Sequence, residues 1–376
     1  MQNPFKKLFE GRFMRQSEES VLGVDVGSSS IKIIQLKKKG GSAVLETYGE
    51  LALGPYSDLE IGQATNLTSE KLSAALADLL KEANTTTNSG GVSIPFSSSL
   101  VTLIQMPAIE EKQLIKMIPI EARKYIPVPI GEVTLDWFII PESEKKFIDS
   151  TVEQDDKKQK VKSIDVLLVA IHNDVLTKYR EIVKGANMTV NFFEIEIFST
   201  IRATLIQTLS PVVIFDMGAA TTKLYIVEYG IVKASHLINR GSQNITLSLS
   251  KSLGMNIAKA EEYKREVGLL GTGDQKNANE AMLLVLDHIF AETNRFVLNY
   301  QKKFNKNIGQ TILTGGGSVL KGMLDLATKN LNTEVLLADP FSKIETPAFL
   351  EQVLKEVGPE FGVAVGIALR KLQETE

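Results

Sequence analysis

The chain has 376 residues, a formal net charge of −3, 43% hydrophobic residues and 23% charged residues. These values fit a globular protein of two domains or lobes and give no sign of bulk nucleic-acid binding. The absence of cysteine excludes disulfides, thiolate metal sites and a cysteine nucleophile. No apolar run is long enough to cross a bilayer and no signal peptide precedes the first strand, so we expect a cytosolic protein.

The first segment, residues 1–15, carries phenylalanines and leucines at helical spacing among lysines and arginines. A basic amphipathic segment of this kind can lie on an anionic membrane surface. The alternative, a frayed terminus ahead of the first strand, fits a short chain end better. A polar linker follows, so residues 1–20 form one N-terminal unit.

Residues 21–35 read V-L-G-V-D-V-G-S-S-S-I-K-I-I-Q, with apolar runs on both sides of a D-x-G turn. Such runs predict two buried strands of a hairpin. The glycine permits a tight turn, and the small residues after it leave backbone N–H groups uncovered, where a phosphate can bind. Asp25, at the strand end, can hold a hydrated Mg²⁺.

The next residues predict a strand at 43–53, a helix at 67–82 and then a separate α+β block at residues 92–186. Within that block, residues 142–162 are mostly charged, which is typical of an exposed hairpin tip. The elements expected in the block are strands at 92–95, 100–106, 134–140 and 163–170, and helices at 109–125 and 174–184.

Residues 212–227 read V-V-I-F-D-M-G-A-A-T-T-K-L-Y-I-V and repeat the first hairpin. A single D-x-G turn is ordinarily a hairpin whose aspartate binds its own backbone. An internal duplication, however, indicates two similar half-domains, which would clamp one polyphosphate from both sides. The aligned pairs are Asp25 and Asp216, Gly27 and Gly218, Ser30 and Thr221, and Lys32 and Lys223.

The second half continues with a helix-rich stretch at 240–298 and a short strand at 311–314. A Gly-Gly-Gly-Ser turn and a helix follow that strand. The last helix, residues 361–372, has glycine and alanine at alternating positions, which would let one face pack very closely on a neighbour.

The order of these elements resembles the actin, Hsp70 and sugar-kinase superfamily, whose segments are called phosphate-1, connect-1, phosphate-2, adenosine and connect-2. Within it the chain resembles the PilM family of type IV pilus assembly, with the FtsA cell-division family next. The sequence E-A-R-K-Y-I-P-V-P at residues 121–129 carries part of that resemblance. It implies an α/β fold: an actin-like ATPase with two lobes around a nucleotide cleft and an FtsA/PilM-type inserted subdomain.

The resemblance also implies a division of the chain into subdomains. The expected ranges are 1–20 for the N-terminal segment, 21–91 for subdomain 1A, 92–186 for the inserted subdomain 1C, 187–210 for subdomain 1A with connect-1, 211–240 for subdomain 2A, 241–300 for helical subdomain 2B, 301–357 for subdomain 2A with the adenosine segment, and 358–376 for subdomain 1A with connect-2.

By the same resemblance the chain binds ATP and Mg²⁺, with Asp25 and Asp216 as the metal-binding carboxylates. Ala219 and Ala220 stand where many relatives have glycine, and their methyl groups limit how closely a phosphate approaches. Glu261 could accept ribose hydroxyls and Lys264 could lie over the base, although an E-x-x-K pair is also a common solvated helix pair. The nucleotide-binding residues implied are Asp25, Gly27, Ser28, Ser29, Ser30, Lys32, Asp216, Gly218, Ala219, Thr221, Thr222, Glu261, Lys264, Gly315, Gly316, Gly317 and Ser318.

Glu196 stands where relatives have an acidic residue in connect-1, which can orient the water that attacks the γ-phosphate. Glu194 is close enough to be the alternative, and Ile197 replaces the proline of the family pattern. We therefore expect at most a slow Mg²⁺-dependent ATPase.

The function implied is a scaffold at the cytoplasmic face of the inner membrane that docks the N-terminal cytoplasmic tail of a PilN-like protein. Other pilus assembly proteins, further copies of the chain and a weak membrane contact are additional partners, and nucleic acid is not one. The alternatives are an FtsA-like filament, a small-molecule kinase of the same fold and a pseudo-enzyme that binds nucleotide without turnover.

Overall fold

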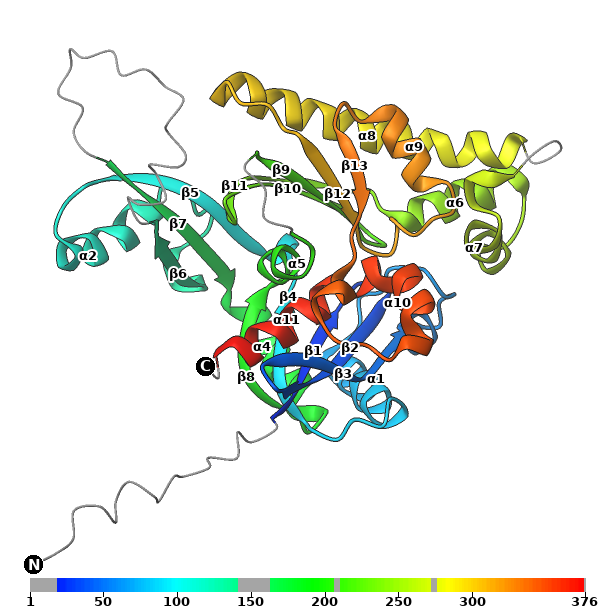
Figure 1. The fold of residues 1–376 in the computed structure, drawn as a ribbon, viewed down its shortest axis with the longest axis horizontal. Coiled ribbons are helices and arrows are strands. Elements are labelled where there is room, and N and C mark those ends of the chain that lie inside the picture. Colours follow the sequence, from blue (N-terminus) through cyan, green and yellow to red (C-terminus); the bar gives the residue numbers. More distant parts are fainter. Residues whose placement is uncertain (1–18, 141–162, 206–209, 272–275, 375–376) are drawn as a thin grey trace, which may run out of the picture.

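The computed structural model describes residues 19–140, 163–205, 210–271 and 276–374 (Figure 1). The predicted N-terminal amphipathic segment and the charged stretch at 142–162 lie outside the described residues. No helix of the described ranges combines the length and the apolar character that a membrane span requires.

The first sheet has five strands in the order β3-β2-β1-β4-β8. β1 and β2 form the first predicted hairpin, β3 continues it antiparallel, and β4 and β8 add parallel strands beside β1. The bounds are β1 Ser20–Val26, β2 Ser30–Lys39, β3 Ser42–Ala52, β4 Ser89–Ile94 and β8 Thr189–Ile195.

The second sheet repeats this topology in the order β11-β10-β9-β12-β13. β9 and β10 form the second hairpin, β11 continues it antiparallel, and β12 and β13 run parallel beside β9. The bounds are β9 Val212–Met217, β10 Thr222–Glu228, β11 Ile231–Ile238, β12 Gln310–Thr314 and β13 Glu334–Leu337. The two five-stranded sheets therefore have the same strand order and the same strand directions, and each contains one copy of the D-x-G hairpin.

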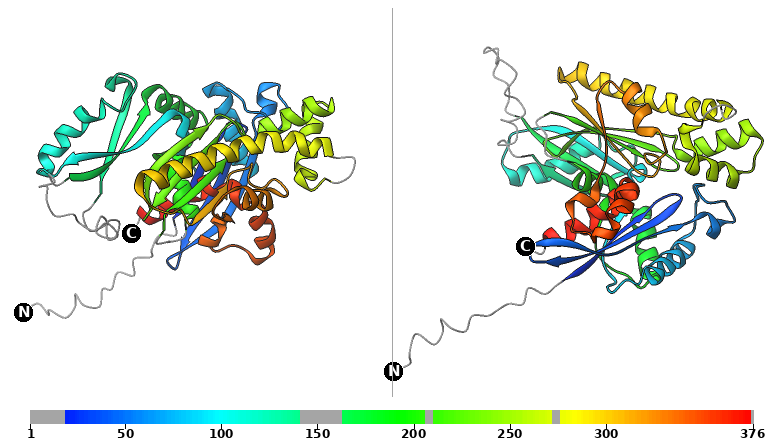
Figure 2. Two further views of the ribbon diagram at one scale, coloured as in Figure 1. Left: turned by 90° about the horizontal axis from the view of Figure 1, so that it is seen from above. Right: turned by 45° about the vertical axis from the view of Figure 1, so that its right-hand side comes forward.

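Alternate residues of the first sheet face two different helical layers, as the period of a strand requires. One face packs on α1 (Ser69–Glu82) and α4 (Asn173–Gly185), where Leu22 and Val24 join the core. The other face packs on α11 (Gly362–Glu374), where Val21 is fully buried. With α5 (Glu196–Thr204), α11 lies between the two lobes (Figures 1 and 2).

The glycines of α11 and β1 allow the close packing expected of the last helix. A Cβ atom on Gly366 would lie 2.0 Å from the carbonyl oxygen of Ser199 in α5. A Cβ on Gly23 in β1 would lie equally close, 2.0 Å, to the carbonyl oxygen of Ala364. Any larger residue at either position would push the helix away from its neighbour.

The second sheet packs one face on helices whose apolar residues form a core around Phe215 and Phe290. The connecting loop after β12 is longer than the sequence indicated, because the helix predicted directly after the glycine turn begins only at Met323. The helix bounds in this lobe are α6 Ser242–Leu253, α7 Ile257–Glu266, α8 Lys276–Phe304 and α9 Met323–Asn330; α10 Glu351–Val357 precedes α11.

A third, three-stranded sheet in the order β5-β7-β6 stands to one side of the lobes and carries α2 (Figure 1). Its bounds are β5 Ser99–Pro107, β6 Val133–Ile139, β7 Ser163–His172 and α2 Glu111–Ala122. Residues 92–94 of β4 and all of α4 fall within the range 92–186 predicted for the insert, yet both elements pack in the core of the first lobe. Their apolar residues are buried there because β4 pairs with β1 and α4 packs on α1.

Candidate functional site

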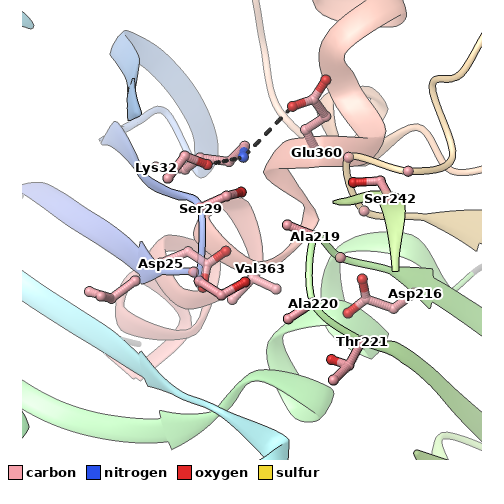
Figure 3. Close-up of a pocket in the computed structure, with 18 of the residues that line it drawn as sticks. Asp25, Ser29, Lys32, Asp216, Ala219, Ala220, Thr221, Ser242, Glu360 and Val363 are labelled. Carbon is pink, nitrogen blue, oxygen red and sulfur yellow. Dashed lines mark hydrogen bonds and ion pairs between the residues drawn. The ribbon is translucent and has the colours of Figure 1, made fainter. Parts of the chain in front are cut away.

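Both D-x-G turns open onto one cavity of about 520 Å³ between the lobes. Figure 3 shows Asp25 and Asp216 reaching toward this cavity from the two hairpins, with Ala219 and Ala220 between them. The turn after β12 and residues of α7 also line the cavity. The volume lies within the range of small-molecule and cofactor sites.

Lys223 on β10 lines the cavity and joins two carboxylates. Its Nζ lies 2.6 Å from Oε2 of Glu196 and 2.9 Å from Oδ2 of Asp216. Burial alone would lower the pKa of Lys223, but Asp216 and Glu196 outweigh it and raise that pKa well above its ordinary value. Lys223 therefore carries a full positive charge between the lobes.

Glu196, the first residue of α5, faces the cavity with both carboxylate oxygens already bonded. Its Oε1 accepts the backbone N–H of Phe96 at 2.7 Å, and its Oε2 accepts Lys223. Burial raises the pKa of Glu196, and Lys223 opposes that rise.

Glu194, the alternative water-positioning residue, does not line the cavity. Its carboxylate accepts hydrogen bonds from Arg202, Arg370 and Ser199. These bonds join β8, α5 and α11, so the role of Glu194 is to hold the helices between the lobes together. Of the two acidic residues, the geometry leaves only Glu196 at the site.

Asp25 ends β1 on the opposite side of the cavity. Its Oδ1 accepts the hydroxyl of Ser93 at 2.7 Å. Burial raises the pKa of Asp25, while Ser93 and the nearby Lys223 oppose that rise.

Lys32 stands directly opposite Asp25 in the hairpin register, but its ammonium turns toward other partners. Its Nζ donates to Oε1 of Glu50 at 2.8 Å and to Oγ of Ser30 at 2.9 Å, and it lies 3.7 Å from Oε2 of Glu360 (Figure 3). Burial would lower the pKa of Lys32, but Glu50 and Glu360 raise it. The repeated lysines thus serve different carboxylates in the two lobes.

The glycine turn after β12 packs against the second hairpin as only glycine can. Gly315 has a φ of +82°, and a Cβ there would lie 2.5 Å from Oδ1 of Asp216. A Cβ on Gly317 would lie 2.3 Å from Cγ of Met217. Without these Cβ atoms the turn brings its backbone to the cavity wall beside Asp216.

The two lobes come into contact where α7 lines the cavity. Glu261 on α7 accepts Lys264 at 2.6 Å, Arg265 at 2.7 Å and the hydroxyl of Thr246 at 2.6 Å. Gly62 of the first lobe lies against it, because a Cβ there would be 2.4 Å from Cδ of Glu261.

The structure brings together most of the residues that the sequence indicated. Two of them lie outside the lining: Thr222 is buried and donates to the carbonyl of Arg240, and Ser318 donates to the carbonyl of Thr314. The residues that do line the cavity are Asp25, Gly27, Ser28, Ser29, Ser30, Lys32, Glu196, Asp216, Gly218, Ala219, Thr221, Glu261, Lys264, Gly315, Gly316 and Gly317.

Four other residues that shape the site were not among the predicted site residues: Glu50, Ser93, Lys223 and Glu360. Lys223 could have been predicted from the sequence, because the internal repeat aligns it with the predicted site residue Lys32. Nothing local marks the other three, since sheet pairing and packing bring them to the site from distant parts of the chain.

The lining fits a nucleotide with its Mg²⁺. Two turns present small residues and backbone N–H groups, and basic side chains lie at both ends. Within the described part of the chain no group of three or more His, Cys, Asp or Glu could hold a metal ion by itself. Mg²⁺ fits nonetheless, because it binds through one or two carboxylates plus substrate phosphates and water, and Asp25 and Asp216 supply two.

A family model and a solved structure that match this chain both describe PilM. The model of the family described as type IV pilus assembly protein PilM matches residues 23–372. A solved structure described as a PilM–PilN type IV pilus biogenesis complex has a TM-score of 0.76 and 23% identity, covering 93% of this chain and 98% of that chain.

Two further solved structures share the fold at lower identity. The ethanolamine utilization protein EutJ from Carboxydothermus hydrogenoformans has a TM-score of 0.53 and 14% identity, covering 93% of this chain and 89% of its own. MreB5 of Spiroplasma citri bound to AMPPNP has a TM-score of 0.51 and 11% identity, covering 95% and 97%. The predicted actin-like fold is thereby confirmed.

Proposed function

The chain belongs to the PilM family of type IV pilus assembly proteins, and on this premise we propose an ATP-binding scaffold that docks the cytoplasmic tail of a PilN-like membrane protein. The observation that carries the nucleotide part is the convergence of the two repeated D-x-G turns on one cavity. The family match does not favour the alternatives of a division filament or a small-molecule kinase.

The proposed site holds the phosphates between the turns at Gly27 and Gly218. Mg²⁺, bound through the phosphates near Asp25 and Asp216, would neutralise part of the phosphate charge. Lys32 faces the same cavity and adds a cation at the first turn. MreB5, which shares the fold, was solved with AMPPNP bound, which supports a nucleotide of this type.

The nucleoside is proposed to lie toward Glu261 and Lys264, with the glycine turn at 315–317 against it. Glu261 already accepts three donors, and a ribose hydroxyl would add a further hydrogen bond to a carboxylate that has several acceptor sites. Burial lowers the pKa of Lys264, while Glu261 opposes that effect. The side chains of Lys264 and Glu261 are only 8% and 6% exposed, which supports a role in the site over that of a solvated helix pair.

The partner is proposed from the comparison in which a PilM protein was solved in complex with PilN. The three-stranded sheet with α2 stands to one side of the two lobes, next to β11 (Figure 1), and an extended apolar peptide is proposed to bind where it meets them. Attachment to PilN would hold the chain at the inner face of the cytoplasmic membrane. A weak lipid contact of residues 1–15 would reinforce it.

The partner proposal is tested with a synthetic peptide of the cytoplasmic PilN tail and a matched peptide whose apolar residues are replaced by serine. We expect saturable binding of the native peptide alone, measured by fluorescence anisotropy. Absence of saturable binding, or equal binding of the serine peptide, would contradict the docking role while leaving the nucleotide proposal standing.

A further inference from the structure

The two repeated lysines differ in what they hold. Lys32 bonds Glu50 on the neighbouring strand of its own sheet. Lys223 on the second sheet bonds Glu196 on α5 at 2.6 Å, and Glu196 in turn accepts the backbone N–H of Phe96, which follows β4 of the first sheet. Lys223 therefore links the second sheet to α5, whereas Lys32 makes its direct bonds to Glu50 and Ser30 and not to its aligned Asp25.

This arrangement leaves Glu196 poorly suited to activate water. A residue that orients an attacking water must present an acceptor toward it, and its negative charge must be free to strengthen the hydrogen bond. Here one oxygen accepts the Phe96 amide and the other accepts the Lys223 ammonium, and the Glu196 side chain is only 12% exposed. Each oxygen keeps a further acceptor site, but the two bonds fix the orientation of the carboxylate and the ammonium offsets its negative charge. The same ammonium also contacts Asp216.

We propose, resting on the ATP binding proposed above, that Lys223 holds the Glu196 carboxylate against the Phe96 amide and so prevents it from activating water. Hydrolysis forms a bond between the water oxygen and the γ-phosphorus and breaks the bond from that phosphorus to the β–γ bridging oxygen. ADP, phosphate and a released proton result. With Lys223 in place Glu196 does not assist this step, so the cleft retains ATP.

The first test measures amide hydrogen exchange by mass spectrometry in the nucleotide-free protein. Lys223→Met should increase exchange of the peptide containing the Phe96 amide by roughly tenfold, because Glu196 is no longer held there. Lys223→Arg keeps the cation and should leave that exchange near the wild-type value. Unchanged exchange in Lys223→Met would overturn the proposal, and this experiment requires no ATP binding.

The second test measures single-turnover hydrolysis of ATP at saturating protein. Lys223→Met should hydrolyse ATP at least about tenfold faster than the wild type, and Lys223→Met with Glu196→Gln should lose that gain. A merely structural lysine would not produce a gain that depends on Glu196. No gain in a Lys223→Met protein that binds ATP, or a gain that survives Glu196→Gln, would overturn the inference.

Calorimetric titration of the wild type with ATP distinguishes a failure of the proposed ATP binding from a failure of the proposed role of Lys223. Absence of ATP binding to the wild type would remove the proposed nucleotide function and this inference with it. Normal ATP binding together with a failed exchange or turnover test would remove the inference alone.

Discussion

The Glu194 cluster gives the sharpest stability prediction, because one carboxylate joins three elements away from the cavity. Its Oε1 accepts Arg202 at 2.8 Å and Arg370 at 2.9 Å, and its Oε2 accepts Arg202 at 2.7 Å. Glu194→Gln keeps the size of the side chain but removes its charge and turns one acceptor into a donor. Two guanidinium groups then lose their anion.

The expected cost follows from the burial of the partners. Removing one member of a buried ion pair costs about 3–5 kcal/mol. The side chains of Arg202 and Arg370 are 23% and 33% exposed, so water screens part of the lost interaction. We therefore expect Glu194→Gln to lower the free energy of unfolding by about 2–3 kcal/mol near neutral pH.

The same cluster predicts a pH dependence. Burial opposes ionisation of Glu194, but Arg202, Ser199 and Arg370 outweigh it and lower its pKa below the ordinary 4.5. A carboxyl group whose folded pKa is depressed stabilises the protein above its unfolded pKa, and this stabilisation is lost as pH falls through the folded pKa. The difference between wild type and Glu194→Gln should therefore shrink below about pH 4.5.

Urea unfolding followed by circular dichroism, from neutral pH down to about pH 3, measures both effects. Glu82→Gln, at the exposed end of α1, is the matched control and should leave the free energy of unfolding nearly unchanged. A Glu194→Gln protein as stable as this control, or a difference from wild type that does not change with acidification, would refute the reasoning.

Three further outcomes are expected. The Cβ of Gly366→Ala would lie 2.0 Å from the carbonyl oxygen of Ser199, so this variant should lower the free energy of unfolding, measured with urea, by about 1–3 kcal/mol. In the control Gly131→Ala the new Cβ meets nothing within 4 Å, and the free energy of unfolding should change little. Lys32→Met should weaken ATP binding about tenfold in calorimetry, and unchanged affinity would exclude Lys32 from the site. ATP at a hundredfold excess over its Kd should stabilise the wild type by about 2.7 kcal/mol in thermal unfolding, and a similar gain in Asp216→Ala would argue for binding elsewhere.

The sequence was most informative where chemistry and local structure coincide. The two D-x-G hairpins were predicted from apolar runs around a glycine turn, and their repetition predicted two similar lobes. In each case the signal lies within a few neighbouring residues.

What the sequence did not show depends on pairing between distant segments. β11 and β13 were not predicted. They are the two outer strands of the second sheet, and they form by pairing with β10 and β12. The limits of the insert were set too wide because β4 and α4 resemble its own elements and differ only in which core buries them. Glu194 and Glu196 could not be told apart, since their partners Arg370 and Lys223 come from elsewhere in the chain.

The measurement that tests the central claim most directly is calorimetric titration of ATP, with Mg²⁺ present, into wild type, Asp25→Ala and Asp216→Ala. The account predicts one ATP site per chain in the wild type. It predicts an affinity lower by roughly tenfold to a hundredfold in each variant, because each aspartate contributes a charged or metal-linked contact. Equal ATP affinity in all three proteins would contradict binding between the two repeated hairpins.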